Sequence, residues 1–278
     1  MSGLKIIVIC YLGKMIKILI LLFIVGVLLA IWAFGFEPNM LKVTTYRVAK
    51  PELSGLKIAF ASDFHIAPRH KKRLEKIVKK INEQKADLIL LGGDFVKGHK
   101  FETSMPIEEI AQELSKLDAP LGVVSVLGNH DWWQNGQKIK EVLQDSGIVV
   151  LENENQKLIY NGRLLLLAGL ADYNTRKVDI DKALSETENN VLLLTHSPDV
   201  FPEIPQKVFL TLAGHTHGGQ VTLPWWGALL VPSKYGKKYE GGFIEENGKK
   251  MIVGRGLGTS LLPVRLGCMP EIVVVEFY

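Results

Sequence analysis

Residues 56–65 read Leu-Lys-Ile-Ala-Phe-Ala-Ser-Asp-Phe-His, a short apolar run that ends in an aspartate and a histidine. The apolar part has the length and the composition of a strand that is covered on both faces. Similar runs at 87–91, 121–127, 191–195 and 208–212 are each followed closely by polar residues. The repeated pattern predicts buried strands with polar clusters at their ends.

Helical patterns separate the first three of these runs. Apolar residues recur at helical spacing in 74–81 and again in 107–117. Strands that alternate with helices predict βαβ units and a largely parallel sheet. The loops after parallel strands emerge at one edge of the sheet, where open α/β folds bind ligands. The five polar clusters are therefore predicted to converge.

The clusters contain the residue types that hold two metal ions, including five of the seven histidines of the chain. Two carboxylates, one carboxamide and four imidazoles form an oxygen and nitrogen set that suits Mn, Fe, Zn or Co. Two cations about 3.5–4 Å apart can lower the pKa of a shared water and stabilise an in-line displacement at phosphorus. We therefore predict hydrolysis of a phosphate ester, with candidate residues Asp63, His65, Asp94, Asn129, His130, Asp131, His196, His215 and His217.

Each cluster taken alone has an ordinary structural explanation. The aspartates can cap helices that follow strands, Asn129 can be a turn residue, and His196 can be a core histidine. Only a common site explains all the clusters together. His70 and His99 lie outside them in lysine-rich stretches, and we expect both to be solvated.

The order of the clusters resembles the signature of the calcineurin-like metallophosphoesterases. Asp-x-His, Gly-Asp, Gly-Asn-His-Asp, a lone His and Gly-His-x-His follow one another between about Leu56 and Gln220, and the ending Gly218-Gly219-Gln220 matches a bacterial branch. The resemblance implies a four-layer α/β/β/α sandwich. It also implies two divalent metal ions, with manganese expected first.

By this resemblance one metal takes Asp63, His65, Asp94 and His217, and the other takes Asp94, Asn129, His196 and His215. His130 is then left to contact the substrate, where it stabilises charge on the phosphoryl oxygens or protonates the leaving group. Asp131 is expected to orient His130.

At two places the sequence departs from the patterns of known phosphatase classes of this superfamily. Serine/threonine protein phosphatases of this superfamily carry Gly-Asp-x-x-Asp-Arg-Gly, whereas residues 93–98 read Gly-Asp-Phe-Val-Lys-Gly. Purple acid phosphatases place a tyrosine ligand directly after the second aspartate, where this chain has Phe95. A protein phosphatase and a ferric tyrosinate are therefore not expected.

The N-terminus contains nineteen residues without a charge, from Ile18 to Phe36, with Lys17 before them and Glu37 after. That length can span a bilayer. A secretory signal peptide is the alternative, but the run is long for one and no clear small-x-small cleavage site follows. We expect an uncleaved single-pass anchor in the cell (inner) membrane. Basic residues flank both ends equally, so the positive-inside rule predicts no orientation.

The sequence therefore predicts three segments, which are an anchor at 1–36, a linker and lead-in at 37–55, and one catalytic domain at 56–278. Residues 1–36 carry three lysines and no acid, which leaves 30 Lys and Arg against 29 Asp and Glu in the rest. The nearly neutral remainder argues against a nucleic-acid partner. Two distant cysteines make no disulfide framework, and no protein partner is implied.

The second half of the chain turns to β structure. Asn161-Gly162 and Asn247-Gly248 each separate two apolar runs and predict type I′ hairpins. The chain ends in an apolar run at 272–277. A second sheet packed on the first is therefore expected.

Two further features bear on the substrate. Trp225-Trp226 closely follows the last cluster, and tryptophan favours membrane interfaces. We hypothesise that this segment meets lipid, either the bilayer or an acyl substrate; core packing is the alternative. Arg255 and Arg265 are candidates for a phosphate-binding fork, although such arginines are more often structural.

Together these observations predict a membrane-anchored phosphohydrolase for a phosphodiester or pyrophosphate, with a substrate that is lipid-linked or lies near membrane lipid. Anchored members of the branch it resembles include broad phosphodiesterases and enzymes that cleave UDP-2,3-diacylglucosamine in lipid A biosynthesis. The second is our specific hypothesis. The alternatives are a broad-specificity cell-envelope phosphodiesterase or phosphatase and a non-catalytic metal-binding membrane scaffold.

Overall fold

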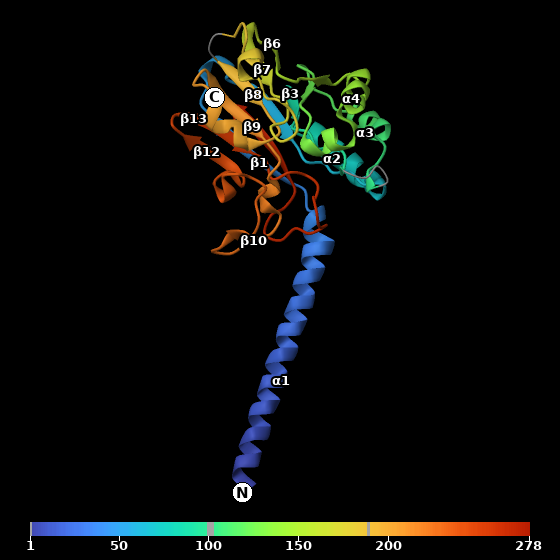
Figure 1. The fold of residues 1–278 in the computed structure, drawn as a ribbon, viewed down its shortest axis with the longest axis vertical. Helices are drawn as coiled ribbons and strands as arrows, with labels where there is room; N and C mark the ends of the chain where they lie inside the picture. Colours follow the sequence, from blue (N-terminus) through green and yellow to red (C-terminus); the bar gives the residue numbers. More distant parts are fainter. Residues whose placement is uncertain (1, 99–102, 188–189) are drawn as a thin grey trace.

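The computed structural model describes residues 2–98, 103–187 and 190–278, so His99 lies outside the described residues. Two six-stranded sheets stack face to face, helices cover their outer faces, and one long helix projects from the base of the domain (Figure 1). The arrangement is the four-layer α/β/β/α sandwich that we expected.

The first sheet has the strand order β1-β14-β2-β3-β4-β5. Strands β2 to β5 run parallel, and β14 pairs antiparallel with β2. Its strands are β1 (Lys42–Val48), β2 (Lys57–Ala61), β3 (Leu88–Leu91), β4 (Val123–Ser125), β5 (Val149–Val150) and β14 (Glu271–Phe277).

The second sheet has the order β12-β13-β9-β8-β7-β6, with parallel pairing from β13 to β7 and an antiparallel hairpin at each edge. Asn161-Gly162 and Asn247-Gly248 form the hairpin turns, and all four residues have positive φ, as type I′ turns require. The strands are β6 (Glu154–Tyr160), β7 (Arg163–Gly169), β8 (Val191–Leu194), β9 (Val208–Ala213), β12 (Gly242–Glu246) and β13 (Lys249–Val253), and a separate two-stranded hairpin joins β10 (Thr222–Leu223) to β11 (Gly227–Ala228).

Alternation along each strand sends side chains to two different layers. In β2, Ile58 and Phe60 pack between the sheets against Leu192 and Leu210, whereas Ala59 faces the helices. Each large apolar side chain buried in this way contributes about 1.5–3 kcal/mol. Helices α2 (Lys71–Asn82), α3 (Ile107–Leu114) and α4 (Asn129–Asp145) cover the first sheet, and α5 (Ile180–Ala183) covers the second.

The N-terminal helix α1 (Ser2–Ile31) stands away from the domain (Figure 1). The segment Tyr11–Asn39 is long and apolar enough to cross a membrane, and only 6% of its most apolar window is buried. A core helix of a globular domain would be mostly buried, so that explanation does not apply.

Two expectations need correction. Residues 42–48, which we assigned to a linker, form strand β1, which pairs parallel with β14 through Lys42↔Glu271 to Val48↔Phe277. The five polar clusters also do not belong to one sheet: three follow strands of the first sheet and two follow strands of the second. Apolar runs that are buried on both faces look alike in either sheet, so the sequence pattern does not reveal this division.

Candidate metal centre

The seven predicted metal-ligand side chains lie together at the strand ends of both sheets. Six of the seven are buried, and His215 is half-buried. They come from the loops after β2 (Asp63, His65), β3 (Asp94), β4 (Asn129), β8 (His196) and β9 (His215, His217).

The side chains form two groups. In the first group, His217 Nε2 lies 3.1 Å from His65 Nε2 and 3.5 Å from Asp63 Oδ1. In the second, His196 Nε2 lies 3.1 Å from Asn129 Oδ1 and 3.2 Å from His215 Nδ1. Each group has the size and the donor types of one metal site.

Asp94 lies between the two groups. Its Oδ2 is 3.5 Å from His65 Nε2 and 3.3 Å from His196 Nε2. Its Oδ1 accepts a hydrogen bond of 2.8 Å from the backbone N–H of His130. Asp94 Oδ2 therefore faces both groups, while Oδ1 accepts a hydrogen bond from the backbone of the cluster that contains His130.

Three of the four imidazoles have a lowered pKa, which favours the neutral form that binds a cation. Burial lowers the pKa of His65 and His217 well below the ordinary value for histidine, and it also lowers the pKa of His215. Burial acts in the same direction on His196, but the carboxylates of Asp94, Asp63 and Asp172 together outweigh it and hold that pKa well above the ordinary value. Neutral imidazole nitrogens 3.1 Å apart repel each other unless a proton or a cation lies between them. The donor set therefore fits two divalent metals.

Two backbone carbonyls orient the imidazoles. His196 Nδ1 lies 2.6 Å from the Gly92 carbonyl, and His130 Nδ1 lies 2.6 Å from the Lys97 carbonyl. A protonated Nδ1 that donates to a carbonyl leaves Nε2 to face the site. Half-buried His130 also lies edge-on to His65, with ring centroids 4.5 Å apart, so its ring borders the first group.

Asp131 has contacts other than those we expected. Its two carboxylate oxygens accept hydrogen bonds from the backbone N–H groups of Asp94, Phe95, Val96 and Gly128. It thus joins the loops after β3 and β4, whereas the carbonyl of Lys97 contacts the ring nitrogen of His130. The expectation that Asp131 orients the His130 ring is replaced by a contact with backbone groups.

Backbone strain marks the same residues. Asp63, His65, Asp94, His215 and His217 all have φ between 44° and 72°, the left-handed region that residues other than glycine rarely adopt. Such strain persists where the surrounding structure enforces it, typically at functional sites. Sequence patterns carry no direct sign of it.

Sequence reasoning missed two neighbours of the site. Buried Asp172 contributes negative charge that supports the raised pKa of His196 and partly offsets the lowered pKa of His215, and it stands three residues after the end of β7 at Gly169. That pattern offered a usable signal. Asn174 Nδ2 lies 3.4 Å from His215 Nε2, and nothing in the sequence pattern indicated it.

Arg265 has the structural role given above as the more common alternative, and the expectation that His70 is solvated is wrong. Arg265 is buried and donates to backbone carbonyls that include Gly258 and Cys268, so it does not offer a fork to phosphate. Arg255 pairs with Glu271 at 3.3 Å. His70 is half-buried rather than solvated, and its Nδ1 accepts from the Ala67 N–H.

A sandwich of two sheets with a histidine and aspartate centre at the strand ends defines a metal-dependent phosphoesterase. The sequence matches the calcineurin-like phosphoesterase family model over residues 56–228. The chain therefore belongs to the calcineurin-like phosphoesterase family, whose members are hydrolases that use divalent metals. Membership in this family favours an enzyme over the alternative of a non-catalytic metal-binding membrane scaffold.

Full-length relatives agree with this assignment. The chain is 32% identical over 263 residues to the uncharacterized metallophosphoesterase YkuE of Bacillus subtilis. This alignment covers 90% of this chain and 91% of the relative. It is 33% identical over 255 residues to the phosphodiesterase YaeI of Escherichia coli, with coverage of 87% and 92%.

Among solved structures, the chain is similar to a 5′-nucleotidase precursor from Thermus thermophilus, with a TM-score of 0.47 and 13% identity. The match covers 73% of this chain and 49% of the nucleotidase, so this chain spans about half of that protein.

Gly128 provides a test of the close packing around Asp94. A Cβ at Gly128 would lie 2.2 Å from Asp94 Oδ1 and 2.6 Å from His196 Cε1. We expect Gly128→Ala to lower metal affinity by about 10–100-fold, the usual effect of disturbing the groups that support metal ligands. Metal content by elemental analysis measures this loss.

Gly241→Ala is the matched control, because its Cβ would meet no atom closer than 3.4 Å. Full metal content in the Gly128→Ala protein would contradict the proposed role of this packing.

Proposed function

We propose that this chain is a membrane-anchored phosphohydrolase with two metal ions that cleaves a phosphodiester or pyrophosphate bond in an amphiphilic molecule. The observation that carries the proposal is the position of Asp94, whose Oδ2 faces imidazoles of both groups at 3.3–3.5 Å. A carboxylate in that position suits a bridge between two cations.

The two groups would hold one metal each. Asp63, His65 and His217 belong to the first, Asn129, His196 and His215 to the second, and Asp94 is shared. Bound metals would supply an activated water and stabilise the oxygens of the phosphoryl group. The contribution of the chain itself is to keep these side chains in position before substrate arrives.

His130 is the side chain that we assign to the substrate. Its Nδ1 contacts the carbonyl of Lys97 at 2.6 Å, and we assign Nε2 to the contact with a phosphoryl or leaving-group oxygen. When protonated, this nitrogen can donate a hydrogen bond or a proton to that oxygen. We assign Asp131 a positioning role, because its carboxylate holds the backbone of Asp94 rather than the ring of His130.

The contacts at the end of α1 support an anchor that stays attached. Ala33 is buried, and its carbonyl accepts from Arg265 N–H at 3.0 Å. Glu37 is also buried, and its carboxylate accepts from Trp32 Nε1 at 2.7 Å and from Cys268 N–H at 2.6 Å. Cleavage near Ala33 would remove a segment that is packed into the domain, which disfavours the signal-peptide explanation.

A cluster of exposed apolar side chains, here called the apolar rim, supports contact with the bilayer. It consists of Trp225, Trp226, Leu229, Leu230, Leu261 and Leu262, which are 59–99% exposed. Gln220 joins its two loops, because its side chain accepts from Ser260 N–H at 2.6 Å and its carbonyl accepts from Leu266 N–H.

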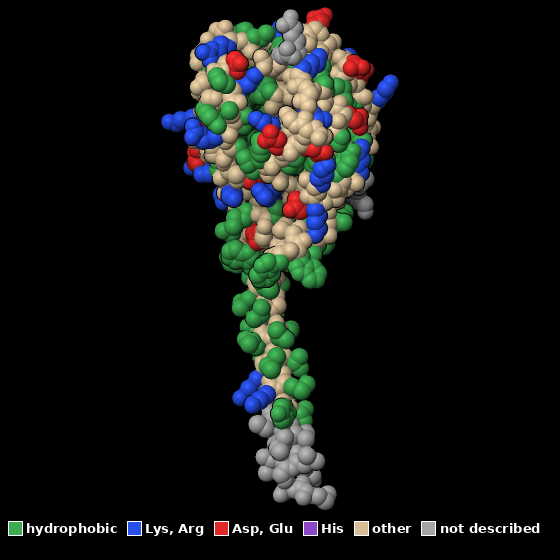
Figure 2. Space-filling view, turned by 90° about the vertical axis from the view of Figure 1, so that its left-hand side faces the viewer, with side chains coloured by type: hydrophobic (Ala, Val, Ile, Leu, Met, Phe, Trp, Pro, Cys, Tyr) green, Lys and Arg blue, Asp and Glu red, His purple; other side chains and the backbone are tan. Residues whose placement is uncertain are grey.

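The apolar rim lies on the anchor side of the domain. Strand β10, which leads into the tryptophan pair, is at the base of the domain beside α1 (Figure 1). Apolar side chains gather where α1 enters the domain (Figure 2). Gln220 also lies three residues after His217, so the rim is close in sequence to the metal centre. An amphiphilic substrate in the bilayer would have a short path to it.

The substrate class follows from these features and from one relative. The E. coli relative is named a phosphodiesterase, which favours a diester. The apolar rim favours a substrate with acyl chains, and UDP-2,3-diacylglucosamine combines acyl chains with a pyrophosphate. A broad phosphodiesterase of the cell envelope is the alternative.

Removing Asp94 and removing His130 should have different effects. We expect Asp94→Asn to lose both metals and all turnover of a soluble aryl phosphodiester. We expect His130→Asn to keep its metals while turnover falls by about 10²–10⁴-fold, the range for a lost acid–base group. Elemental analysis and hydrolysis rates with added Mn measure the two effects.

Asp181→Asn is the control, since Asp181 is exposed on α5 outside the site. Metal loss in His130→Asn would make His130 a ligand instead. Wild-type protein without metal-dependent hydrolysis would refute the proposed function.

A panel of three substrates tests the bond that is cleaved. We expect UDP-2,3-diacylglucosamine to turn over faster than a nucleotide cyclic diester, and the cyclic diester faster than a phosphomonoester, because the site is proposed to serve an amphiphilic diester or pyrophosphate. Initial rates with purified full-length protein in detergent measure the order. A preference for the cyclic diester would favour the broad phosphodiesterase, and a preference for the monoester would contradict both.

The tryptophan pair should affect only substrates in a membrane. Burial of a large apolar side chain contributes about 1.5–3 kcal/mol, and 1.4 kcal/mol corresponds to about tenfold in binding. We expect Trp225→Ser/Trp226→Ser to lower turnover of a lipid-linked substrate in vesicles by about tenfold or more. Hydrolysis of the soluble aryl diester should stay unchanged.

Ile159→Ser/Leu164→Ser is the control, because this exposed apolar pair lies on the distant β6–β7 hairpin (Figure 1). If the tryptophan variant retained both activities equally, the rim would have no role at the membrane.

A further inference from the structure

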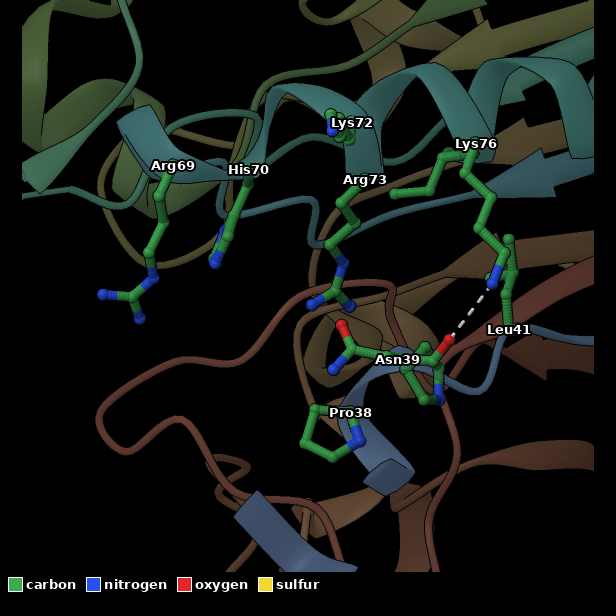
Figure 3. A pocket seen from close by; sticks show the side chains of 10 residues that line it. Pro38, Asn39, Leu41, Arg69, His70, Lys72, Arg73 and Lys76 are labelled. Atoms are coloured by element: carbon green, nitrogen blue, oxygen red, sulfur yellow. Dashed lines mark hydrogen bonds between the residues drawn. The ribbon is translucent and has the colours of Figure 1, made fainter. Parts of the chain in front are cut away.

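A basic pocket lies between α2 and the chain that follows α1 (Figure 3). Its cavity volume is about 340 Å³, and among the described residues its lining contains no carboxylate and none of the candidate metal ligands. One wall carries the nitrogen-bearing side chains of Arg69, His70, Lys72, Arg73 and Lys76, and the opposite wall includes Pro38 and Asn39.

The charged side chains that line this pocket are all basic among the described residues. Burial and the charges of Arg73, Arg69 and Lys97 lower the pKa of His70 to about 4. Burial and the charge of Arg265 lower the pKa of Arg73 to about 10. Nearby positive charges thus disfavour the protonated forms of His70 and Arg73. A bound anion would relieve this repulsion.

The pocket lies at a defined depth relative to α1. The uncharged run from Ile18 to Phe36 has nineteen residues, and at 1.5 Å per residue it is about 28 Å long. The hydrocarbon core of a bilayer is about 30 Å thick. Asn39, three residues beyond Phe36, forms part of the pocket wall, and its carbonyl accepts from Lys76 Nζ at 3.4 Å. Ala33 and Glu37 are buried in the domain, so the bilayer surface lies on the α1 side of them, and the pocket lies close to that surface when α1 spans the bilayer.

Its form suits one phosphate group and not an extended polyanion. Arginine guanidinium groups bind phosphate oxygens in a fork, and lysines add point charges. Pro38, Leu41 and Pro270 give the opposite wall an apolar part, beside the polar side chain of Asn39, and this wall adjoins the chain that leaves α1. A phosphate joined to acyl chains matches cations on one side and apolar surface on the other.

We propose that this basic pocket binds the phosphate group of an anionic phospholipid in the leaflet that faces the catalytic domain. The proposal rests on the membrane-spanning role proposed for α1, and it does not depend on the hydrolytic reaction. The pocket is nevertheless connected to the metal centre. Arg73 donates to the Leu257 carbonyl, and Leu257 N–H donates to the Ser62 carbonyl at 2.9 Å, next to Asp63.

The test uses full-length protein in nonionic detergent micelles and three probes: short-chain phosphatidylglycerol, short-chain phosphatidylcholine and inorganic phosphate. Titration calorimetry should give phosphatidylglycerol an affinity at least about tenfold above that of the other two, because clustered cations attract an anionic headgroup. Arg69→Gln/Lys72→Gln/Lys76→Gln should abolish this preference. These three side chains are exposed, so their replacement leaves the core intact.

Lys79→Gln/Lys80→Gln/Lys85→Gln is the matched control, because it removes three positive charges from α2 and the turn after it without touching the pocket lining. It should keep the preference. An equal loss in both triple variants, or no loss in the pocket variant, would overturn the proposal. Inorganic phosphate that binds as tightly as phosphatidylglycerol would assign the pocket to a free anion instead.

The same preparations are assayed for metal-dependent hydrolysis of a soluble aryl diester. Phosphatidylglycerol preference without hydrolysis would support the pocket and refute the proposed function. Hydrolysis without the preference would do the opposite, so the two failures are distinguishable.

Discussion

The position of the Asp94 carboxylate is the constraint on which the rest of the structure depends. It is buried, with one oxygen held by the His130 backbone and the other facing imidazoles that come from both sheets. A buried carboxylate is costly unless cations or donors compensate it. The two sheets must therefore stack with their strand ends in register, and the leucine-rich layer between them maintains that alignment.

Much of this arrangement could be predicted because its signals are local. An apolar run followed by a polar cluster with aspartate, asparagine or histidine identifies a strand and its terminal loop together, and this pattern contains all seven residues that meet in the centre. The Asn-Gly turns were equally reliable, since few residues other than Asn and Gly adopt positive φ at both positions. Both predicted hairpins, β6–β7 and β12–β13, are present.

The remainder depends on contacts that are distant in sequence. Strand β1 reads as a linker because its exposed positions weaken the apolar pattern, and its partner β14 lies at the other end of the chain. The sequence predicts that Asp131 orients the adjacent His130, yet its carboxylate accepts from backbone N–H groups 35–37 residues earlier. From its sequence context Arg265 could bind phosphate or have a structural role, and only the fold shows that its guanidinium donates to carbonyls inside the domain. No local pattern distinguishes these roles.

The joint between α1 and the domain has a consequence for how substrates are selected. Arg265 and Cys268 contact the end of the helix, and the Cys268 thiol also donates to the carbonyl of His217 at 3.2 Å. A domain on a flexible tether explores a volume that grows with the length of the tether, whereas a domain on a stiff joint only tilts and turns with its helix. With α1 in a bilayer, the catalytic face would work at one height above the membrane. The height of the scissile bond above the membrane would then decide which substrates reach the metal centre, before any chemical contact is made.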